Sequence, residues 1–253
     1  MAHFHITASS RVGCVRTNNE DMILVKDSFL RNGKDRYVFD LEEDKHLLIA
    51  LADGMGGHNC GEVASSDVLH SLHFFFNDLP NDLPDKLDYK SFPDAIYSWL
   101  TSICRTIDAK GHSDPVFLNM GTTLVALAWF GGEFFWMNCG DSRLYRLHNG
   151  ELTQITTDHS LSQMLGKKEH SSLIVNCIGG GCKQSYIDIE NFTDQIEVGD
   201  VLLLCSDGLT DMIDDETIRG QLSDGFDADS LCQLADDAGG CDNVSVIVIH
   251  VEE

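Results

Sequence analysis

The chain has 253 residues, of which 43% are hydrophobic and 8% aromatic, as is ordinary for a globular protein. This length can build one large core, and we expect residues 1–253 to form a single domain. The formal net charge is −24, from 17 basic and 41 acidic side chains. We therefore expect no nucleic acid and no anionic membrane among its partners, because both bind clustered Lys and Arg.

The sequence also predicts a cytoplasmic protein. No apolar run approaches the roughly 20 residues that cross a bilayer, and the first residues lack a basic segment followed by an apolar one. Nine cysteines occur at irregular spacings that match no zinc motif, which suits a reducing compartment. Cys139 and Cys205 lie in apolar runs and are expected to be buried thiols. Cys60 and Cys241 lie near candidate ligand loops, where a redox role and a merely small side chain both stay open.

In chain order, a strand at the N-terminus is followed by two predicted helices. Apolar residues recur at helical spacing over residues 61–77 and again over residues 92–110, so both helices should face a core. The acidic stretch NDLPNDLPD between them contains Pro80 and Pro84 and is predicted to be a loop.

The pattern then changes to short apolar runs typical of strands. TTLVALAWF, EFFWMNCG and RLYRL are joined by the turns FGGE and GDS, and such short connections favour antiparallel pairing. Further strands are predicted at residues 151–155, 185–191, 201–206 and 244–251, with a helix at residues 228–238. The apolar strands VLLLCS and VSVIVIHV should be buried on both faces. The expected fold is α+β, a sandwich of two antiparallel sheets with helices on both outer faces.

Five aspartates stand at the ends of predicted strands, each in a turn of small residues. They are Asp21, Asp53, Asp141, Asp207 and Asp242. One such residue usually only caps a turn, but five spread along the chain suggest that the fold gathers them. Carboxylates that lie close together stay ionised only beside compensating positive charge. Two or more Mg²⁺ or Mn²⁺ ions, which prefer oxygen ligands, would supply that charge, so the pattern predicts metal-assisted hydrolysis.

The residues around these aspartates support the same interpretation. Asp53 lies between HLLIALA and GMGGHNCG, where glycines permit close backbone approach, so the carbonyl of Gly54 is a further candidate ligand. Arg16 precedes Glu20 and Asp21 by four and five residues. Its guanidinium could form a fork with phosphate oxygens beside the metals.

Seven motifs, in order, carry a resemblance to a known family. They are R-x3-ED, ADGMGGH-x2-GE-x-AS, MGTTL, GDSR-x-Y, DHSL, SDGLTD and DN-x-(S/T)-V. The match as a whole extends from about residue 11 to residue 251. Each is weak alone, but the ordered set resembles the bacterial metal-dependent protein phosphatases, the protein phosphatase 2C family. The resemblance implies two central antiparallel sheets flanked by helix pairs. It also implies Mn²⁺- or Mg²⁺-dependent removal of phosphate from phosphoserine and phosphothreonine in proteins.

The resemblance further implies metal-binding roles by matching position. Asp53 would bridge two metal ions, and Gly54 would give its carbonyl. Asp207 and Asp242 would hold one of those ions. Asp141 with Asp207 matches the site of a third, weaker metal.

The remaining implied roles concern the substrate side. Glu20 and Asp21 would bind the other side of the metal cluster, largely through coordinated water, and Arg16 would hold the substrate phosphate. The implied reaction is attack on phosphorus by a metal-bridging hydroxide, in line with the departing serine or threonine oxygen. No covalent phosphoenzyme is needed, so none of the cysteines has to be a nucleophile.

Two places depart from the family pattern. Met55 stands where eukaryotic members have a histidine that can protonate the leaving group. His58 could substitute for it, or water or another group could supply the proton. Between DHSL and residue 187 the chain looks shortened in the segment that forms a flap in relatives. Asn176 or Cys177 falls about where those relatives carry an arginine, so substrate specificity is affected more than catalysis. Lys167, Lys168 and His170 form a basic spot in this flap, which could contact a phosphopeptide or simply be solvated.

Two other classes of function compete with an active phosphatase. A catalytically weak phosphoprotein-binding module would be indicated by loss of a metal ligand, but every matched acid is present. Another two-metal hydrolase, such as a phosphodiesterase, usually mixes histidine with aspartate in its motifs. We therefore expect an active phosphatase, a monomer whose partners are phosphorylated proteins and which acts opposite a serine/threonine kinase.

Overall fold

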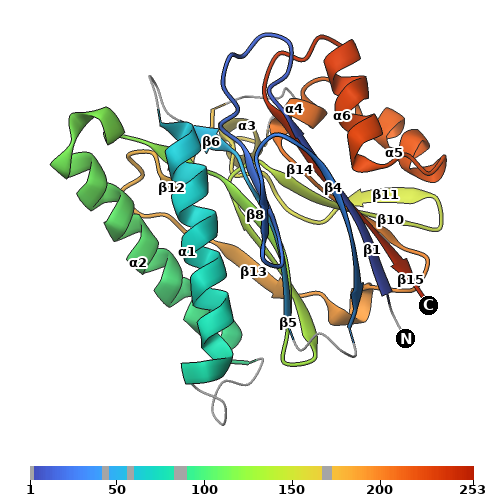
Figure 1. The fold of residues 1–253 in the computed structure, drawn as a ribbon, viewed down its shortest axis with the longest axis horizontal. Coiled ribbons are helices and arrows are strands. Elements are labelled where there is room, and N and C mark those ends of the chain that lie inside the picture. The colour runs from blue at the N-terminus through green and yellow to red at the C-terminus, as the bar shows by residue number, and fades with distance from the viewer. Residues whose placement is uncertain (1–2, 42–45, 56–59, 83–89, 167–172) are drawn as a thin grey trace.

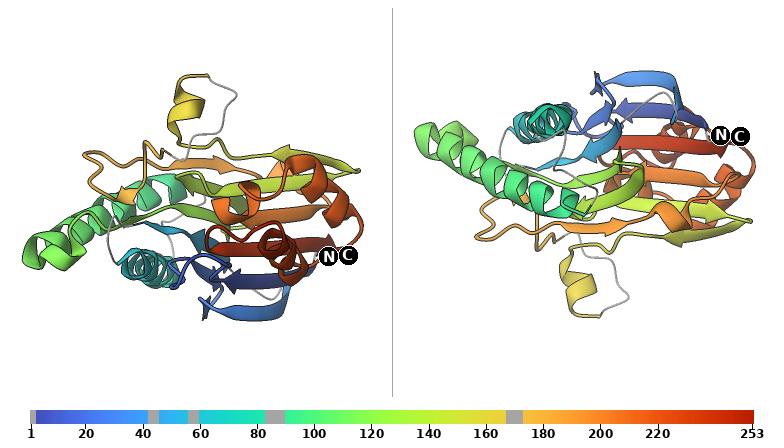
Figure 2. Two further views of the ribbon diagram at one scale, coloured as in Figure 1. Left: turned by 90° about the horizontal axis from the view of Figure 1, so that it is seen from above. Right: turned by 90° about the horizontal axis from the view of Figure 1, so that it is seen from below.

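The computed structural model of the protein describes residues 3–41, 46–55, 60–82, 90–166 and 173–253. Its centre is a pair of six-stranded sheets stacked face to face, and helices cover the outer face of each (Figure 1). The two chain ends lie together at one end of the stack (Figure 2). The α+β sandwich expected from the sequence is confirmed.

The first sheet contains the first and the last strand of the chain. Its strand order is β11 (Glu151–Gln154), β10 (Arg143–His148), β14 (Val201–Cys205), β15 (Val244–Glu252), β1 (His3–Arg11) and β4 (Gly33–Asp40), all antiparallel. β14 and β15 are central and almost entirely buried, as their continuous apolar sequences predict.

The second sheet packs against the inner face of the first. Its strand order is β13 (Asp188–Asn191), β9 (Glu133–Cys139), β8 (Leu124–Phe130), β5 (His46–Ala52), β2 (Met22–Val25) and β3 (Ser28–Leu30). A small third sheet joins β12 (Ile178–Gly179), β7 (Gly121–Thr122) and β6 (Gly54–Met55). An apolar cluster with members such as Ile6, Ile49 and Ile249 fills the space between the two large sheets.

The helices pack against the sheets through their apolar faces. α1 (Gly61–Asp82) and α2 (Phe92–Ser113) cover the second sheet, where the rings of Phe76, Phe92 and Phe130 contact one another. α5 (Asp215–Ser223) and α6 (Ala228–Asp237) cover the first sheet. The short elements are α3 (Leu161–Met164), which projects from the body in Figure 2, α4 (Asp207–Thr210), η1 (Pro115–Phe117) and η2 (Thr193–Gln195).

One prediction about local structure is wrong. Residues 78–82 continue α1 instead of forming a loop, although Pro80 lies among them. One proline removes a single amide donor near the helix end, a small loss beside the packing of the turns before it. Helix α5 begins within an exposed acidic run, and the Asp214 carboxylate accepts the amide of Thr217 and caps the helix. The rest of the predicted loop after α1 lies outside the described residues.

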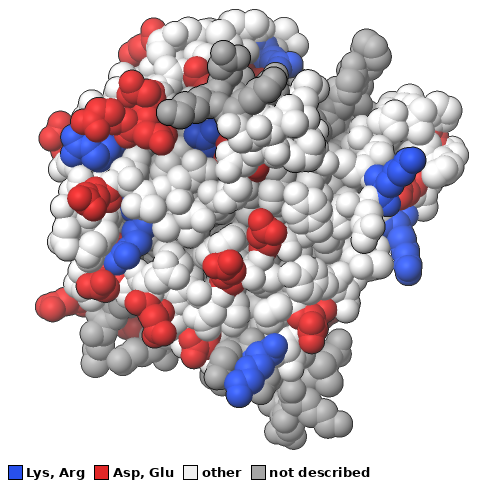
Figure 3. Space-filling model, turned by 180° about the vertical axis from the view of Figure 1, so that it is seen from behind, with Lys and Arg blue, Asp and Glu red and all other residues white. Residues whose placement is uncertain are grey.

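Surface and burial agree with the composition. Acidic side chains are spread over the face shown in Figure 3, with few Lys and Arg among them. None of the helices in the described ranges is long and apolar enough to cross a membrane. Cys139 and Cys205 are fully buried, as predicted. Of the two cysteines near the candidate ligand loops, Cys60 is buried and Cys241 is exposed.

Candidate metal centre

Antiparallel pairing brings the strand-end aspartates of the second sheet to one edge. Met22 pairs with Ala52, so Asp21, which precedes β2, lies beside Asp53, which follows β5. The end of β9 reaches the same edge through β8. Asp141, two residues after β9, therefore lies at this edge as well.

The first sheet contributes its aspartates at the same end of the sandwich. Cys205 pairs with Val246, so Asp207, which follows β14, lies near Asp242, which precedes β15. β10 begins two residues after Asp141 and pairs with the same end of β14. Asp141 thus lies where the chain passes from one sheet to the other, and all five aspartates meet at one end of the stack.

Two threonines hold the backbone of Asp53. Thr123 donates its amide to the Asp53 carbonyl over 2.9 Å, and its Oγ1 accepts the Asp53 amide over 3.0 Å. Thr122 Oγ1 donates to the same carbonyl over 2.8 Å. These bonds use only main-chain groups of Asp53, so they position the residue without engaging its carboxylate.

Two glycines allow the backbone to pack closely beside Asp53. A Cβ on Gly54 would lie 2.2 Å from the carbonyl oxygen of Gly61 and 2.5 Å from that of Glu20. A Cβ on Gly61 would lie 2.6 Å from the carboxylate of Glu20. Only glycine fits at these positions, which agrees with the close backbone approach that the glycine-rich turn predicts.

Burial, together with the charges of neighbouring acids, raises the pKa values of the clustered carboxyl groups. Burial, followed by the charges of Asp21 and Asp207, raises the pKa of Asp53 well above its ordinary value. Burial raises the pKa of Asp21 to about 7, and the charge of Asp207 adds to the rise. Burial and the charge of Asp207 also raise the pKa of Asp141 to about 7, against the opposing charge of Arg143. The nearby cations Arg16 and Arg143 only partly offset the charge of these acids.

Some buried carboxylate oxygens of this cluster accept no hydrogen bond, which also shows that the protein alone does not satisfy these acids. Oδ1 of Asp21 and Oδ1 of Asp141 have no hydrogen-bond partner, and the two residues are 0% and 3% exposed. The other oxygen of Asp21 accepts from Ser206 Oγ over 3.0 Å. Buried acceptors left without partners are costly, and hard divalent cations would satisfy them. This set of oxygen ligands therefore fits Mg²⁺ or Mn²⁺.

Arg16 and Asp242 form an ion pair at the rim of this cluster. Nη2 of Arg16 lies 2.7 Å from Oδ2 of Asp242, and the two side chains are 55% and 39% exposed. Within the described parts of the chain, no three His, Cys, Asp or Glu side chains already form the ligand set of one ion. Asp242, to which the family resemblance assigns a metal, is paired with Arg16 in this structure.

Asn243 positions the loop that carries Arg16 and Glu20, and its role was not predicted. Its Nδ2 donates to the carbonyls of Val12 and Asn18, each over 2.8 Å. Its Oδ1 accepts the amide of Glu20 over 2.8 Å. The motif DN-x-(S/T)-V contains this residue, but its partners lie more than 220 residues earlier in the chain, so periodicity could not reveal them.

The substrate-side predictions are placed only in part. Asn176 is buried in the segment after the flap, with Nδ2 2.7 Å from His159 Nδ1 and 2.8 Å from the Tyr186 carbonyl. Cys177 is also buried, so neither of the two residues presents an exposed side chain. Four predicted residues lie outside the described ranges: His58, Lys167, Lys168 and His170.

Comparison with known proteins agrees with this geometry. Residues 31–237 match the family model described as protein phosphatase 2C. The chain is 36% identical over 259 residues to the serine/threonine protein phosphatase PstP of Mycobacterium tuberculosis, an alignment covering 96% of this chain and 44% of that protein. It is 29% identical to the protein phosphatase PhpP of Streptococcus pneumoniae, with 98% of both proteins covered.

A solved structure gives the same result for the fold. The crystal structure of the catalytic domain of PstP, in complex with two manganese ions, has a TM-score of 0.73 and 33% sequence identity, and the match covers 100% of both chains. The present chain spans less than half the length of full PstP but nearly all of PhpP. The family match extends over most of the sandwich, and the chain therefore belongs to the protein phosphatase 2C family.

Proposed function

We propose that this protein is a metal-dependent serine/threonine protein phosphatase that hydrolyses phosphoserine and phosphothreonine in proteins. One observation carries the proposal: five strand-end aspartates meet at one end of the sandwich with too little positive charge from the protein. The names of the relatives PstP and PhpP support the activity, and the two manganese ions of the PstP structure support the cofactor.

The metal-binding roles are proposed for this chain's own residues. When bound, two Mn²⁺ or Mg²⁺ ions would offset the carboxylate charge and lower the pKa of water, so that hydroxide is available near neutral pH. Asp53, with the carbonyl of Gly54, would be the ligand shared by both ions. The other proposed ligands are Asp207 and Asp242 on one side, Glu20 and Asp21 on the other, and Asp141 with Asp207 at a weaker third site.

Arg16 would bind the substrate phosphate after its guanidinium leaves the carboxylate of Asp242. In this structure its guanidinium is held by Asp242, 2.7 Å away. A cation bound by Asp242 would release the guanidinium. Because a guanidinium matches two phosphoryl oxygens at once, the freed Arg16 would orient the phosphate and offset its charge. Metal binding and phosphate binding are then coupled through one ion pair.

The departing serine or threonine oxygen needs a proton, and we propose His58 or water as its source. The two sources separate in a His58→Gln variant. If His58 is the donor, the variant loses the alkaline fall of kcat/KM that titration of the donor causes. An unchanged pH profile excludes His58 and assigns the proton to water or to another group.

The proposal extends to the whole molecule: one domain, monomeric, cytoplasmic, acting on phosphoproteins that a serine/threonine kinase supplies. Support for one domain is the pairing of β1 with β15, which closes the first sheet from the two ends of the chain. Sedimentation equilibrium tests the monomer, because a dimer would double the apparent mass of 28.0 kDa.

A substrate comparison tests the activity against its alternatives. Release of phosphate is measured from p-nitrophenyl phosphate, from a phosphothreonine peptide and from bis-p-nitrophenyl phosphate, each with Mn²⁺ and with EDTA. The phosphatase proposal requires Mn²⁺-dependent turnover of the peptide. Binding of the peptide without turnover would indicate a phosphoprotein-binding module, and turnover of the diester alone would indicate a phosphodiesterase.

A further inference from the structure

A pair of thiols lies on the small sheet next to the candidate metal centre. Cys177 and Cys182 flank β12, and their sulfur atoms are 3.3 Å apart. Both are free thiols; Cys177 is buried, whereas Cys182 is partly exposed. We propose that these two cysteines are a reversible redox site, which a hydroperoxide converts into an intramolecular disulfide.

The loop between the two cysteines is shaped to bring them together. Gly179, Gly180 and Gly181 have φ values of +78°, +61° and +75°, the left-handed region that favours glycine. The amide of Cys182 closes the turn on the carbonyl of Gly179 over 3.0 Å. A Cβ on Gly180 would lie 2.6 Å from Cys177 Sγ, so a larger residue would press against this thiol. Three consecutive glycines thus return the chain to Cys177 after five residues.

A cavity gives an oxidant access to one of the two thiols. It measures about 330 Å³ and lies between α2, η1 and the glycine loop. Cys182 lines it, together with Gly111, Leu118 and Lys183, but Cys177 does not. One water molecule takes about 30 Å³ of liquid volume, so the space admits a small hydroperoxide. Cys182 is therefore the thiol that reacts first, and Cys177 is the thiol that resolves the product.

The chemistry balances with a hydroperoxide as the two-electron oxidant. The Cys182 thiolate sulfur attacks the outer peroxide oxygen: an S–O bond forms, the O–O bond breaks, and the alkoxide leaves as alcohol with the Cys182 proton. The sulfur of Cys177 then attacks that of Cys182. An S–S bond forms, the S–O bond breaks, and the Cys177 proton leaves with the hydroxide as water. A dithiol reductant returns two electrons and restores both thiols.

The pair is connected to the metal centre by backbone pairing. Ile178, next to Cys177, pairs with Thr122, and Thr122 pairs with Gly54. Thr122 also donates to the Asp53 carbonyl over 2.8 Å. A disulfide bond measures about 2.05 Å, so its formation draws the two sulfurs closer by roughly 1 Å and moves the loop against β7. Resting on the proposed function, we expect oxidation to lower Mn²⁺-dependent turnover severalfold.

The first test detects the proposed disulfide in a single tryptic peptide. Cleavage after Lys168 and Lys183 releases residues 169–183, which contain both cysteines and no other. After hydrogen peroxide and alkylation of remaining thiols, this peptide should lose about 2 mass units and resist alkylation, and dithiothreitol should restore it. In Cys177→Ser, Cys182 should instead accumulate sulfinic acid. The matched control, Cys14→Ser, removes an exposed thiol elsewhere and should form the disulfide like the wild type.

The outcomes separate this proposal from the proposed function. The redox site is overturned if peptide 169–183 stays alkylatable while Cys14 or Cys241 is oxidised, or if Cys182 joins a different cysteine. Its link to the metal centre is overturned if the disulfide forms and turnover is unchanged. A reduced protein without phosphatase activity would instead refute the proposed function, and the mass measurement would still decide the disulfide.

Discussion

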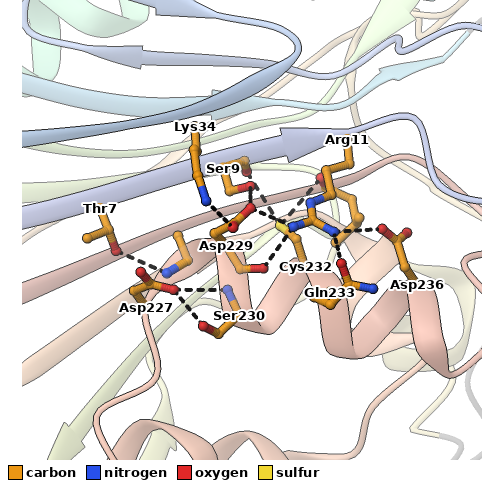
Figure 4. Close-up of polar contacts among 12 residues, drawn as sticks. Thr7, Ser9, Arg11, Lys34, Asp227, Asp229, Ser230, Cys232, Gln233 and Asp236 are labelled. Carbon is orange, nitrogen blue, oxygen red and sulfur yellow. Dashed lines mark hydrogen bonds and ion pairs between the residues drawn. The ribbon is translucent and has the colours of Figure 1, made fainter.

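Two groups of aspartates in this molecule meet opposite electrostatic surroundings. On α6, Asp229 accepts from Arg11 Nη2 and from Lys34 Nζ, each over 2.6 Å, and from Ser9 Oγ over 3.2 Å (Figure 4). The hydrogen bonds from Lys34 and Arg11 lower the pKa of Asp229 to about 2. At the end of the sandwich, by contrast, burial and neighbouring acids raise the pKa of Asp21 to about 7.

The difference shows that an acidic cluster stabilises a fold by itself only where the protein also supplies the neutralising cations. The α6 cluster has its cations supplied by β1 and β4, so the fold itself completes the site. The strand-end cluster has more acids than nearby cations, so its charge is completed only by something outside the chain. A deficit of this kind, at converging strand ends, is the physical signature of a functional site.

The largest expected effect is on the strand-end cluster. Asp53→Asn should reduce phosphatase turnover at least about 100-fold, because it removes a carboxylate oxygen from the proposed ligand shared by both metal ions. It should also abolish the rise in melting temperature that Mn²⁺ causes in the wild type, while circular dichroism shows the fold intact. Asp229→Asn is the matched control and should keep the Mn²⁺ response. Near-wild-type turnover in Asp53→Asn would contradict the assigned centre.

The α6 cluster should show the reverse behaviour. Asp229→Ala should lower the free energy of unfolding by about 1–3 kcal/mol, because Arg11 and Lys34 lose a partly buried acceptor. Arg11 keeps Asp236 at 3.0 Å, which limits the loss. Urea denaturation measures the change, and kcat/KM per folded molecule should not move. A variant as stable as the wild type would show that this cluster contributes little.

The pH dependence follows from the lowered pKa of Asp229. A carboxyl group whose folded pKa lies below its unfolded value stabilises the protein above the unfolded value, and this stabilisation is lost as pH falls toward the folded pKa. With a folded pKa of about 2, the stability difference between wild type and Asp229→Asn should be constant near neutral pH and shrink below about pH 4. Urea midpoints from pH 7 down to pH 3 measure it. A difference that grows on acidification would refute the pairing.

Arg16→Ala should have a smaller effect, mainly on substrate binding. Loss of one bidentate phosphate contact should raise KM by about 5- to 20-fold with a smaller change in kcat. Arg16→Lys should recover part of the loss, because it keeps the charge but not the fork. Initial rates with a phosphothreonine peptide give both constants. A change in kcat alone would mean that Arg16 acts only in the transition state.

Lys34→Ala should have the smallest effect. Its side chain is 66% exposed, so its ion pair with Asp229 is screened by water. We expect a loss below about 1 kcal/mol in the free energy of unfolding. A loss as large as that of Asp229→Ala would mean that Lys34, and not Arg11, holds the α6 cluster together.

Most elements that position the metal centre could be predicted from residue patterns. The alternation and apolar runs predict the strands that end at Asp53, Asp141 and Asp207, and the ordered motifs identify the family. The loop predicted around Pro80 is the end of α1, because one missing amide donor weighs less than tertiary packing. The positioning role of Asn243 was not predicted either, because its side-chain amide joins loops that are far apart in the chain. Such contacts produce no periodic pattern in the sequence.

Local pattern thus settles which segments are strands or helices and which acids stand at their ends, because periodicity and turn chemistry act between neighbours in the chain. Three features depend on the folded arrangement: the pairing of Arg16 with Asp242, the opposite pKa shifts of Asp229 and Asp21, and the approach of Cys182 to Cys177 beside a cavity. Each is set by strand register and by side chains packing across long separations, and such contacts are determined only when the whole chain is folded.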